Sequence, residues 1–381
     1  MRKYLIIFIL FSAFGSTALS DASPAEKHYK NATAYHTIGE FAQAISEYKK
    51  AIALDPNSPI LYNKLGVAYS ELKQYDAALD AYQKTLELSP TIAEPHYNIG
   101  VVYLKKGNLP HAAEAFKCAI EIDTEWGDPY TGLGEVHLKQ GDFEGAARAY
   151  KKATHLNPKS AGAILGLGKV YARQKRLDAA IATFEKTIEI QVDNTEAHYQ
   201  LAQIYIKRGE KKAAASAMAF FKVLRQTDPL LEKAEMWVKK YPDDARGYNN
   251  LGIVYLARRR FTDAVANYKR AISLSPDLVT AHYNLGHAYH KHGKVDLAIA
   301  AYQQALTIDA DLAIAHNNIA VCYTELKMDL DKALSHARTA VRLAPTDGNY
   351  WDTLSQVCDA LGLVNEAQHA RKKQKEHSDN Q

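Results

Sequence analysis

Cysteine is scarce in this sequence: its 381 residues include three, Cys118, Cys322 and Cys358, and no two of them form a Cys-x2-Cys pair. This count and spacing argue against a disulfide framework or a four-cysteine zinc module, so we interpret Cys322 and Cys358 as small buried apolar residues. The motifs Gly-x4-Gly-Lys-Ser/Thr, His-Glu-x2-His and Gly-x-Ser-x-Gly are also missing. The sequence therefore predicts a protein that is not an enzyme and that needs no cofactor.

An excess of one charge is lacking too. The chain has 47 Lys and Arg against 43 Asp and Glu, a formal net charge of +4. Proteins whose main partner is a nucleic acid usually carry a pronounced basic surface. The balance therefore argues against nucleic acid as the partner, and it does not identify another ligand.

Long apolar runs are rare, and the main one lies at the start of the chain. Arg2 and Lys3 precede an apolar run over residues 4–14, and the small residues Ala18 and Ser20 follow it. A helix of that length reaches about 16 Å, whereas the bilayer interior is about 30 Å thick. We therefore predict a secretory signal peptide over residues 1–20 and an exported protein, periplasmic or secreted if bacterial. Retention of this segment as an anchor remains the alternative.

The rest of the sequence repeats with a period of 34 residues. One unit carries the following residues: Tyr248, Leu251, Gly252, Tyr255, Ala264, Tyr268, Ala271 and Pro276. Adding 34 to these numbers gives the next unit: His282, Leu285, Gly286, Tyr289, Ala298, Tyr302 and Ala305, with Ala310 in place of the proline. The first four residues of each unit have the spacing i, i+3, i+4, i+7, which is one face of a helix, and the next three mark a second helix. Each unit is therefore predicted to be a helix hairpin.

This pattern resembles the tetratricopeptide repeat (TPR), and the resemblance covers roughly residues 25–375. It implies an all-α fold, a right-handed α-solenoid of about ten stacked antiparallel hairpins. It also implies a scaffold or adaptor whose first helices line a concave groove that holds a protein or an extended peptide.

The period is interrupted once. Six units are expected over residues 25–229, the last of them with an insertion, and four over residues 245–375, the last of them a polar cap. Residues 230–244, which follow Pro229 and contain Pro242, are interpreted as a degenerate half repeat of one helix. We expect this break to divide the stack into two blocks, and we expect residues 376–381 to be a disordered tail.

Asparagines recur at a position that the resemblance places in the groove. They are Asn98, Asn250, Asn284 and Asn318, which we call the ladder asparagines. A carboxamide can donate to and accept from a peptide backbone, and the pattern is similar to the asparagine ladder in the repeat arm of O-linked N-acetylglucosamine transferase. The alternative is a solvated residue common at this position. One residue earlier, where chaperone-binding relatives have a lysine, this chain has other residues, among them Tyr283.

Basic residues mark a second groove-edge position. They are Lys105, Lys139, Arg173, Lys207 and Lys291. Such a basic row would favour acidic ligands, and the alternative is a set of solvated helix charges. His287, His290 and His292 crowd one helix end, but no paired motif completes a zinc site.

The sequence thus favours an exported TPR scaffold that binds a protein or an extended peptide in its groove, in envelope assembly, secretion or complex organisation. The alternative is an accessory docking subunit of a glycan or lipid-linked polymer export or synthase complex, with peripheral contact to a membrane complex. The oligomeric state is left open.

Overall fold

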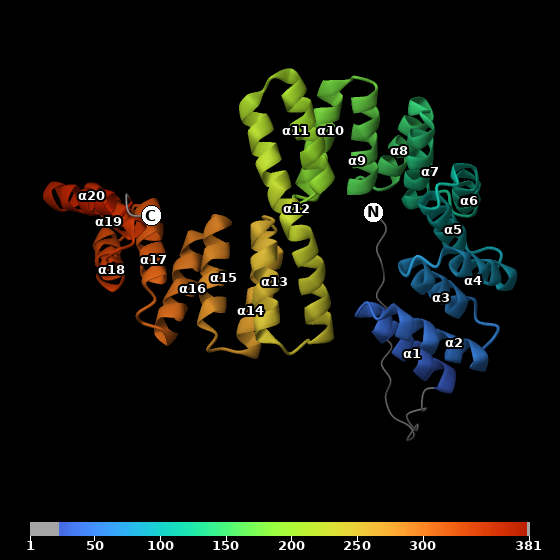
Figure 1. Ribbon diagram of the computed structural model, residues 1–381, viewed down its shortest axis with the longest axis horizontal. Helices are drawn as coiled ribbons and strands as arrows, with labels where there is room; N and C mark the ends of the chain where they lie inside the picture. The colour runs from blue at the N-terminus through green and yellow to red at the C-terminus, as the bar shows by residue number, and fades with distance from the viewer. Residues whose placement is uncertain (1–22, 379–381) are drawn as a thin grey trace, which may run out of the picture. The chain divides into compact units, whose positions relative to one another are not determined.

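The computed structural model describes residues 23–378, and within this range it contains 20 helices and no strand. The prediction of an all-α fold is confirmed. Consecutive helices pack as antiparallel hairpins, and within each of the two units described below neighbouring hairpins pack against each other, which is the arrangement of an α-solenoid. The chain divides into two compact units, residues 1–123 and 124–381, which are described separately (Figure 1).

The first unit contains three hairpins. Their helices are α1 (Pro24–Thr37), α2 (Phe41–Leu54), α3 (Pro59–Glu71), α4 (Tyr75–Leu88), α5 (Ala93–Lys105) and α6 (Leu109–Ile122).

The second unit contains the remaining seven pairs. Their helices are α7 (Gly127–Gln140), α8 (Phe143–Leu156), α9 (Ala161–Arg173), α10 (Leu177–Ile190), α11 (Thr195–Arg208), α12 (Lys211–Lys240), α13 (Ala245–Ala257), α14 (Phe261–Leu274), α15 (Val279–Lys291), α16 (Val295–Ile308), α17 (Ala313–Leu326), α18 (Leu330–Leu343), α19 (Gly348–Leu361) and α20 (Val364–Ser378).

The repeat glycine allows the two helices of a hairpin to come close together. A Cβ atom placed on Gly252 of α13 would lie 2.5 Å from the Cε1 atom of Tyr268 on α14. Tyr268 itself is fully buried, as are Ala264 and Ala271 on either side of it. The glycine is therefore required because an aromatic ring from the second helix packs directly on it, and the small alanines let the neighbouring backbones approach.

Helix α12 departs from this plan. With 30 residues it is about twice as long as the other helices, and it packs against α11 and also against α13 (Figure 1). The sequence predicts two separate helices here, the first ending at Pro229, but Pro229 lies inside one continuous helix. A proline inside a helix lacks an N–H donor and crowds the carbonyl groups of the preceding turn.

Side chains bond two carbonyl groups further back in α12, five and six residues before Pro229. The Thr227 hydroxyl donates to the carbonyl oxygens of Val223 (2.9 Å) and Leu224 (3.1 Å). Arg258, at the end of α13, also donates to the Leu224 oxygen (3.4 Å). The bond from Arg258 links the part of α12 just before the proline to α13.

A buried arginine connects this part of α12 to the turn before α11. Arg258 is 5% exposed and donates from Nε to Asp193 (2.8 Å) and from Nη1 to Asp228 (2.8 Å). Asp193 belongs to the α10–α11 turn and is also 5% exposed. Arg258 therefore joins α10–α11, α12 and α13 within the second unit. Whether stacking divides into two blocks at residues 230–244 stays a prediction.

The C-terminal helix is longer than expected. Helix α20 extends to Ser378, and Lys373 and Glu376 on it form an ion pair at 2.8 Å. Such a pair three residues apart supports the last helical turns, so the expected tail at 376–381 does not begin at residue 376.

The predicted signal peptide at 1–20 lies outside the described residues. Within residues 23–378, none of the helices combines the length and apolar character needed to cross a bilayer.

Candidate functional site

A cavity of about 530 Å³ opens between α13 and α15, on the side of the first helices, and we call it the first-helix cavity. Its lining is mainly apolar, with Ile253 and Leu256 from α13 and Phe261 from the start of α14. Ile253 is 45% exposed. The full set of lining residues is Ile253, Leu256, Ala257, Arg259, Phe261, Tyr268, Asn284, His287 and Lys291. The cavity thus brings together two residues singled out from the sequence, Asn284 and Lys291.

Asn284 lines the first-helix cavity, and its carboxamide oxygen is available to a ligand there. Its Nδ2 donates to Oδ1 of Asn249 at 3.0 Å, while no hydrogen bond within residues 23–378 uses its own Oδ1. Asn249 is 7% exposed and lies on the neighbouring first helix, α13. The bond therefore orients the Asn284 side chain and leaves an acceptor for a ligand N–H.

Asn318 is more fully engaged. Its Nδ2 lies 3.3 Å from the hydroxyls of Tyr283 and Tyr302, and its Oδ1 lies 3.5 Å from Asn317 Nδ2. Burial raises the pKa of the Tyr283 hydroxyl. Tyr283 thus positions a ladder asparagine of the next repeat.

The other two ladder residues differ from each other. Asn250 is exposed, and its side chain makes no hydrogen bond within the described residues. Asn98, in the first unit, donates to Oδ1 of buried Asn63 at 3.3 Å. The sequence interpretation missed this pairing with the asparagine one residue earlier in the preceding repeat. The sequence does contain a signal for this pairing: Asn63 and Asn98 are 35 residues apart, and so are Asn249 and Asn284.

The first-helix cavity has a positive rim. None of its nine lining residues is acidic, and Arg259 and Lys291 form no ion pair within the described part of the chain. The guanidinium of Arg259 stacks on Phe220, 4.3 Å from the ring centroid. The pKa of His287 is lowered by burial and by nearby Lys291 and His290. His287 is therefore neutral near pH 7, and the two remaining cations favour a ligand with negative charge.

The predicted basic row has a simpler structural feature in common. Lys105, Lys139, Arg173, Lys207 and Lys291 each lie in the last turn of a first helix. Positive charge near a helix C-terminus interacts favourably with the helix dipole. Lys139 also lies 3.7 Å from Glu135 of its own helix. In the second unit the row is interrupted at α13, where Ala257 is the last residue of the helix.

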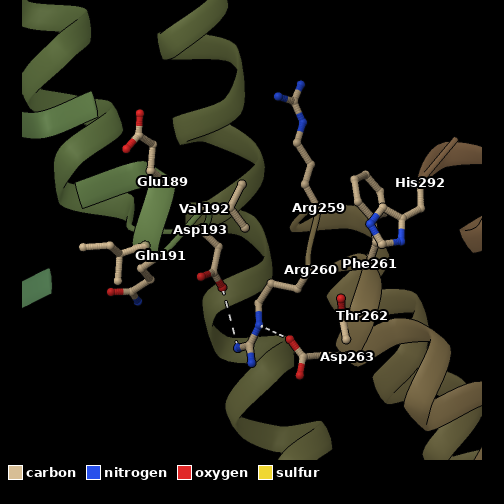
Figure 2. A pocket seen from close by; sticks show the side chains of 11 residues that line it. Glu189, Gln191, Val192, Asp193, Arg259, Arg260, Phe261, Thr262, Asp263 and His292 are labelled. Atoms are coloured by element: carbon tan, nitrogen blue, oxygen red, sulfur yellow. Dashed lines mark hydrogen bonds and ion pairs between the residues drawn. The ribbon is translucent and has the colours of Figure 1, made fainter. Parts of the chain in front are cut away.

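A second cavity, of about 670 Å³, lies on the other side of the α13–α14 turn. Figure 2 shows Arg260 between Asp193 and Asp263, and Arg259 pointing away from both carboxylates. Arg260 Nε donates to Asp263 at 2.9 Å, and its Nη1 lies 3.9 Å from Asp193. The charges here are mostly satisfied within the chain, so this cavity is a weaker candidate for a ligand than the first-helix cavity.

The three clustered histidines have different surroundings. His287 lines the first-helix cavity, His290 lies 2.8 Å from Glu325 of α17, and His292 stacks on Phe261 with ring centroids 5.5 Å apart. Within residues 23–378, no three His, Cys, Asp or Glu residues are arranged to hold a metal ion.

The cysteines are free thiols, and burial raises the pKa of Cys322 to about 12 and that of Cys358 to about 11.

Comparison with family models agrees with the hairpin geometry. Residues 254–293 match the model described as TPR repeat, and residues 279–312 the model described as Tetratricopeptide repeat. Residues 20–219, more than half of the chain, match the model described as Cilia and flagella-associated protein 70 C-terminal domain. The chain belongs to the tetratricopeptide repeat family. Such repeats form protein-interaction scaffolds, and the family is generally non-enzymatic.

Solved structures similar to parts of the chain include several repeat proteins. A MamA protein is 28% identical, over 44% of this chain and 91% of its own, with a TM-score of 0.39. MamA 41-end from Desulfovibrio magneticus RS-1 is 22% identical, over 46% and 99%, with a TM-score of 0.41. YrrB, described as a TPR protein with an unusual peptide-binding site, is 22% identical, over 61% and 95%, with a TM-score of 0.34. No curated protein matches the chain.

Proposed function

We propose that this protein is a non-enzymatic scaffold that binds an extended segment of a partner protein at the first-helix cavity. The observation that supports this most is the lining of the cavity, which combines exposed apolar side chains with an oriented carboxamide oxygen and two cations. Binding sites of this kind are mostly apolar and carry a few polar groups that fix the orientation of the ligand.

Each group suggests one property of the bound segment. Ile253 and Leu256 would receive an apolar side chain, because burying their exposed surface is favourable. Asn284 Oδ1 would accept a hydrogen bond from a backbone N–H of the segment. Arg259 and Lys291 would favour an acidic residue beside the apolar one.

We also propose that the protein acts after export, in envelope assembly, secretion or complex organisation. The support is the basic, apolar and small-residue order at residues 2–20. In this setting the partner is a protein of the same compartment.

The experiment that tests the site is capture of partners from a native envelope extract by the tagged protein and by two variants. Ile253→Asp places a charge in the cavity lining. Leu297→Asp is the matched control, because Leu297 is 48% exposed, close to the 45% of Ile253, but lies on the second helix α16. We expect Ile253→Asp to lose a partner that the parent protein and Leu297→Asp both retain.

Equal capture by all three proteins would contradict the proposed site. The identity of the partner separates the two roles considered from the sequence. A single exported protein supports the scaffold role, whereas a membrane polymerase complex supports the docking subunit.

A further inference from the structure

The second half of α12 corresponds to the second helix of a repeat. Subtracting the 34-residue period from Ala264, Tyr268, Ala271 and Pro276 gives, in order, Leu230, Ala234, Trp237 and Pro242. The helix ends agree, since α14 ends at Leu274 and α12 at Lys240, each two residues before its proline position. The second half of α12 is therefore a second helix in register with its neighbour.

The first helix that should precede it is missing from the stack. First helices α11 and α13 begin at Thr195 and Ala245, 245 − 195 = 50 residues apart, which is one period of 34 plus 16. Sixteen residues are enough for one extra second helix but not for a hairpin. The chain accordingly continues from one second helix directly into another, and this continuous pair is α12.

As a consequence, a face that is buried in complete repeats is open to solvent here. Ala264 and Ala271 are fully buried, whereas the equivalent Leu230 and Trp237 are 53% and 47% exposed. Tyr241 lies on the same side, is 44% exposed, and has its ring 4.5 Å from that of Trp237. We call Leu230, Ala234, Trp237 and Tyr241 the half-repeat face. Ala234 is half-buried and packs partly against the core beside α13, and one edge of the Trp237 ring lies against Gly247 of α13, so the open part of the face is mainly Leu230, Tyr241 and the rest of the Trp237 ring.

The geometry points to a docking site for an amphipathic helix of a partner protein, which would take the place of the missing first helix. Such a helix would be about 14 residues long, like the first helices of this chain. Its apolar stripe would cover the half-repeat face, as in other cases where a helix binds a hydrophobic surface. This site is separate from the first-helix cavity and does not depend on it.

The residue sizes on this face differ from those of a complete repeat. The complete repeat of α13 and α14 has Tyr268 between two alanines, and this tyrosine packs on Gly252 of the first helix. The half-repeat face instead has Ala234 between Leu230 and Trp237. The partner helix should therefore carry a large apolar residue opposite Ala234, where the chain's own repeats carry glycine, and small residues opposite Trp237.

The charge beside the half-repeat face indicates which charge the partner helix should carry on its flank. Lys233 lies on one side of the half-repeat face and is exposed. The nearby acidic groups are already bonded, Glu235 to the Tyr255 hydroxyl (2.6 Å) and Asp244 to Trp237 Nε1 (2.7 Å). The partner helix should therefore carry an acidic residue on that flank.

The probe for a test is a labelled synthetic helix of 14 residues. It keeps the first-helix apolar pattern, has leucine in place of the repeat glycine, and carries one glutamate on the flank that faces Lys233. A second probe has a lysine in place of the glutamate. Binding is followed by fluorescence anisotropy. In a Trp126→Phe, Trp351→Phe background, the emission of Trp237 reports whether its ring becomes buried.

We expect the acidic probe to bind about two- to tenfold more tightly than the basic probe and to shift Trp237 emission to shorter wavelength. Lys233→Glu should reduce or reverse this preference. Leu230→Ser should weaken binding about tenfold or more without disturbing the Trp237–Asp244 bond. Met236→Ala is the matched control, because Met236 is also 47% exposed but lies off the half-repeat face, and it should bind like the parent.

Three results would overturn the proposal. The first is failure of both probes to bind while the protein stays folded. The second is equal weakening by Met236→Ala and Leu230→Ser. The third is a concentration-dependent dimer of the protein alone that Leu230→Ser abolishes, because a second copy would then be the occupant.

Discussion

Asn284 on α15 donates its side-chain N–H to the buried Oδ1 of Asn249 on α13 at 3.0 Å. Asn98 and Asn63 form the same pair in the first unit at 3.3 Å. In both cases a ladder asparagine bonds to a residue of the preceding repeat. That residue comes one place before the ladder position of its own repeat. A ladder asparagine thus joins neighbouring repeats as well as offering an acceptor to a ligand.

Asn249→Ala should therefore destabilise the second unit, although this residue lies outside the ladder. The change removes the acceptor of the Asn284 N–H at a position that is 7% exposed, and such a loss costs about 1–3 kcal/mol. Asn250→Ala, at the neighbouring exposed position, should change stability by less than about 0.5 kcal/mol. Urea denaturation of both variants checks this. Equal stabilities would show that the asparagine pair contributes nothing.

The hairpins were predictable from the sequence because each depends on local spacing. Gly252 and Tyr268 recur with the period, and their contact follows from that recurrence. The course of α12 was not predictable in the same way. Pro229 is a helix breaker by local rules, and the bonds from Arg258 that accompany the continuous helix come from a residue about 30 positions away. The asparagine pairs were missed because each residue was considered as a ligand for something outside the chain.

Thr353→Asn should stabilise the C-terminal repeats. Asn317 is 9% exposed and its Oδ1 has no hydrogen-bond partner, because the sixth residue of the next first helix is Thr353 rather than an asparagine. An asparagine there could donate to Asn317 as Asn284 donates to Asn249, adding about 0.5–1.5 kcal/mol. Thr353→Val keeps the shape without the donor and should give no gain. Thermal unfolding of the two variants separates these outcomes, and a less stable asparagine variant would contradict the prediction.

Arg258→Met should weaken the second unit strongly. It leaves Asp193, 5% exposed, without its closest cation, and breaking a buried ion pair from one side costs about 3–5 kcal/mol. Arg260→Met is the control, since Arg260 lies 3.9 Å from Asp193 and is more exposed, and it should cost less. Limited proteolysis should cut the Arg258 variant first near Pro229. Similar denaturation midpoints for the two variants would rule out a central role for Arg258.

Cleavage of the N-terminal segment is expected if the protein is exported. The order of residues 1–20 predicts that the mature native protein begins close to Asp21. Intact-mass spectrometry of protein purified from its natural source gives the answer directly. A retained Met1 together with tight membrane attachment would replace secretion by anchoring.

Acidification should destabilise the second unit through His336. Burial, with a smaller contribution from His316, lowers the pKa of His336 to about 4 from an ordinary value of 6.5. His316 donates from Nε2 to the carbonyl oxygen of Ala310 (3.1 Å), so its Nδ1 is left to accept a hydrogen bond from the His336 Nδ1–H at 2.8 Å.

Because the folded pKa is lower than the unfolded one, the unfolded chain binds more protons between these values. The stabilising contribution is therefore complete above pH 6.5 and is lost as the pH falls toward 4. At pH 5 the loss should be on the order of 1 kcal/mol, with allowance for the part of the ring that water reaches. His336→Gln removes the titrating group and keeps a donor for His316. Urea denaturation at pH 7 and pH 5 should show a smaller loss for this variant than for the parent. An identical loss would assign the acid sensitivity to other groups.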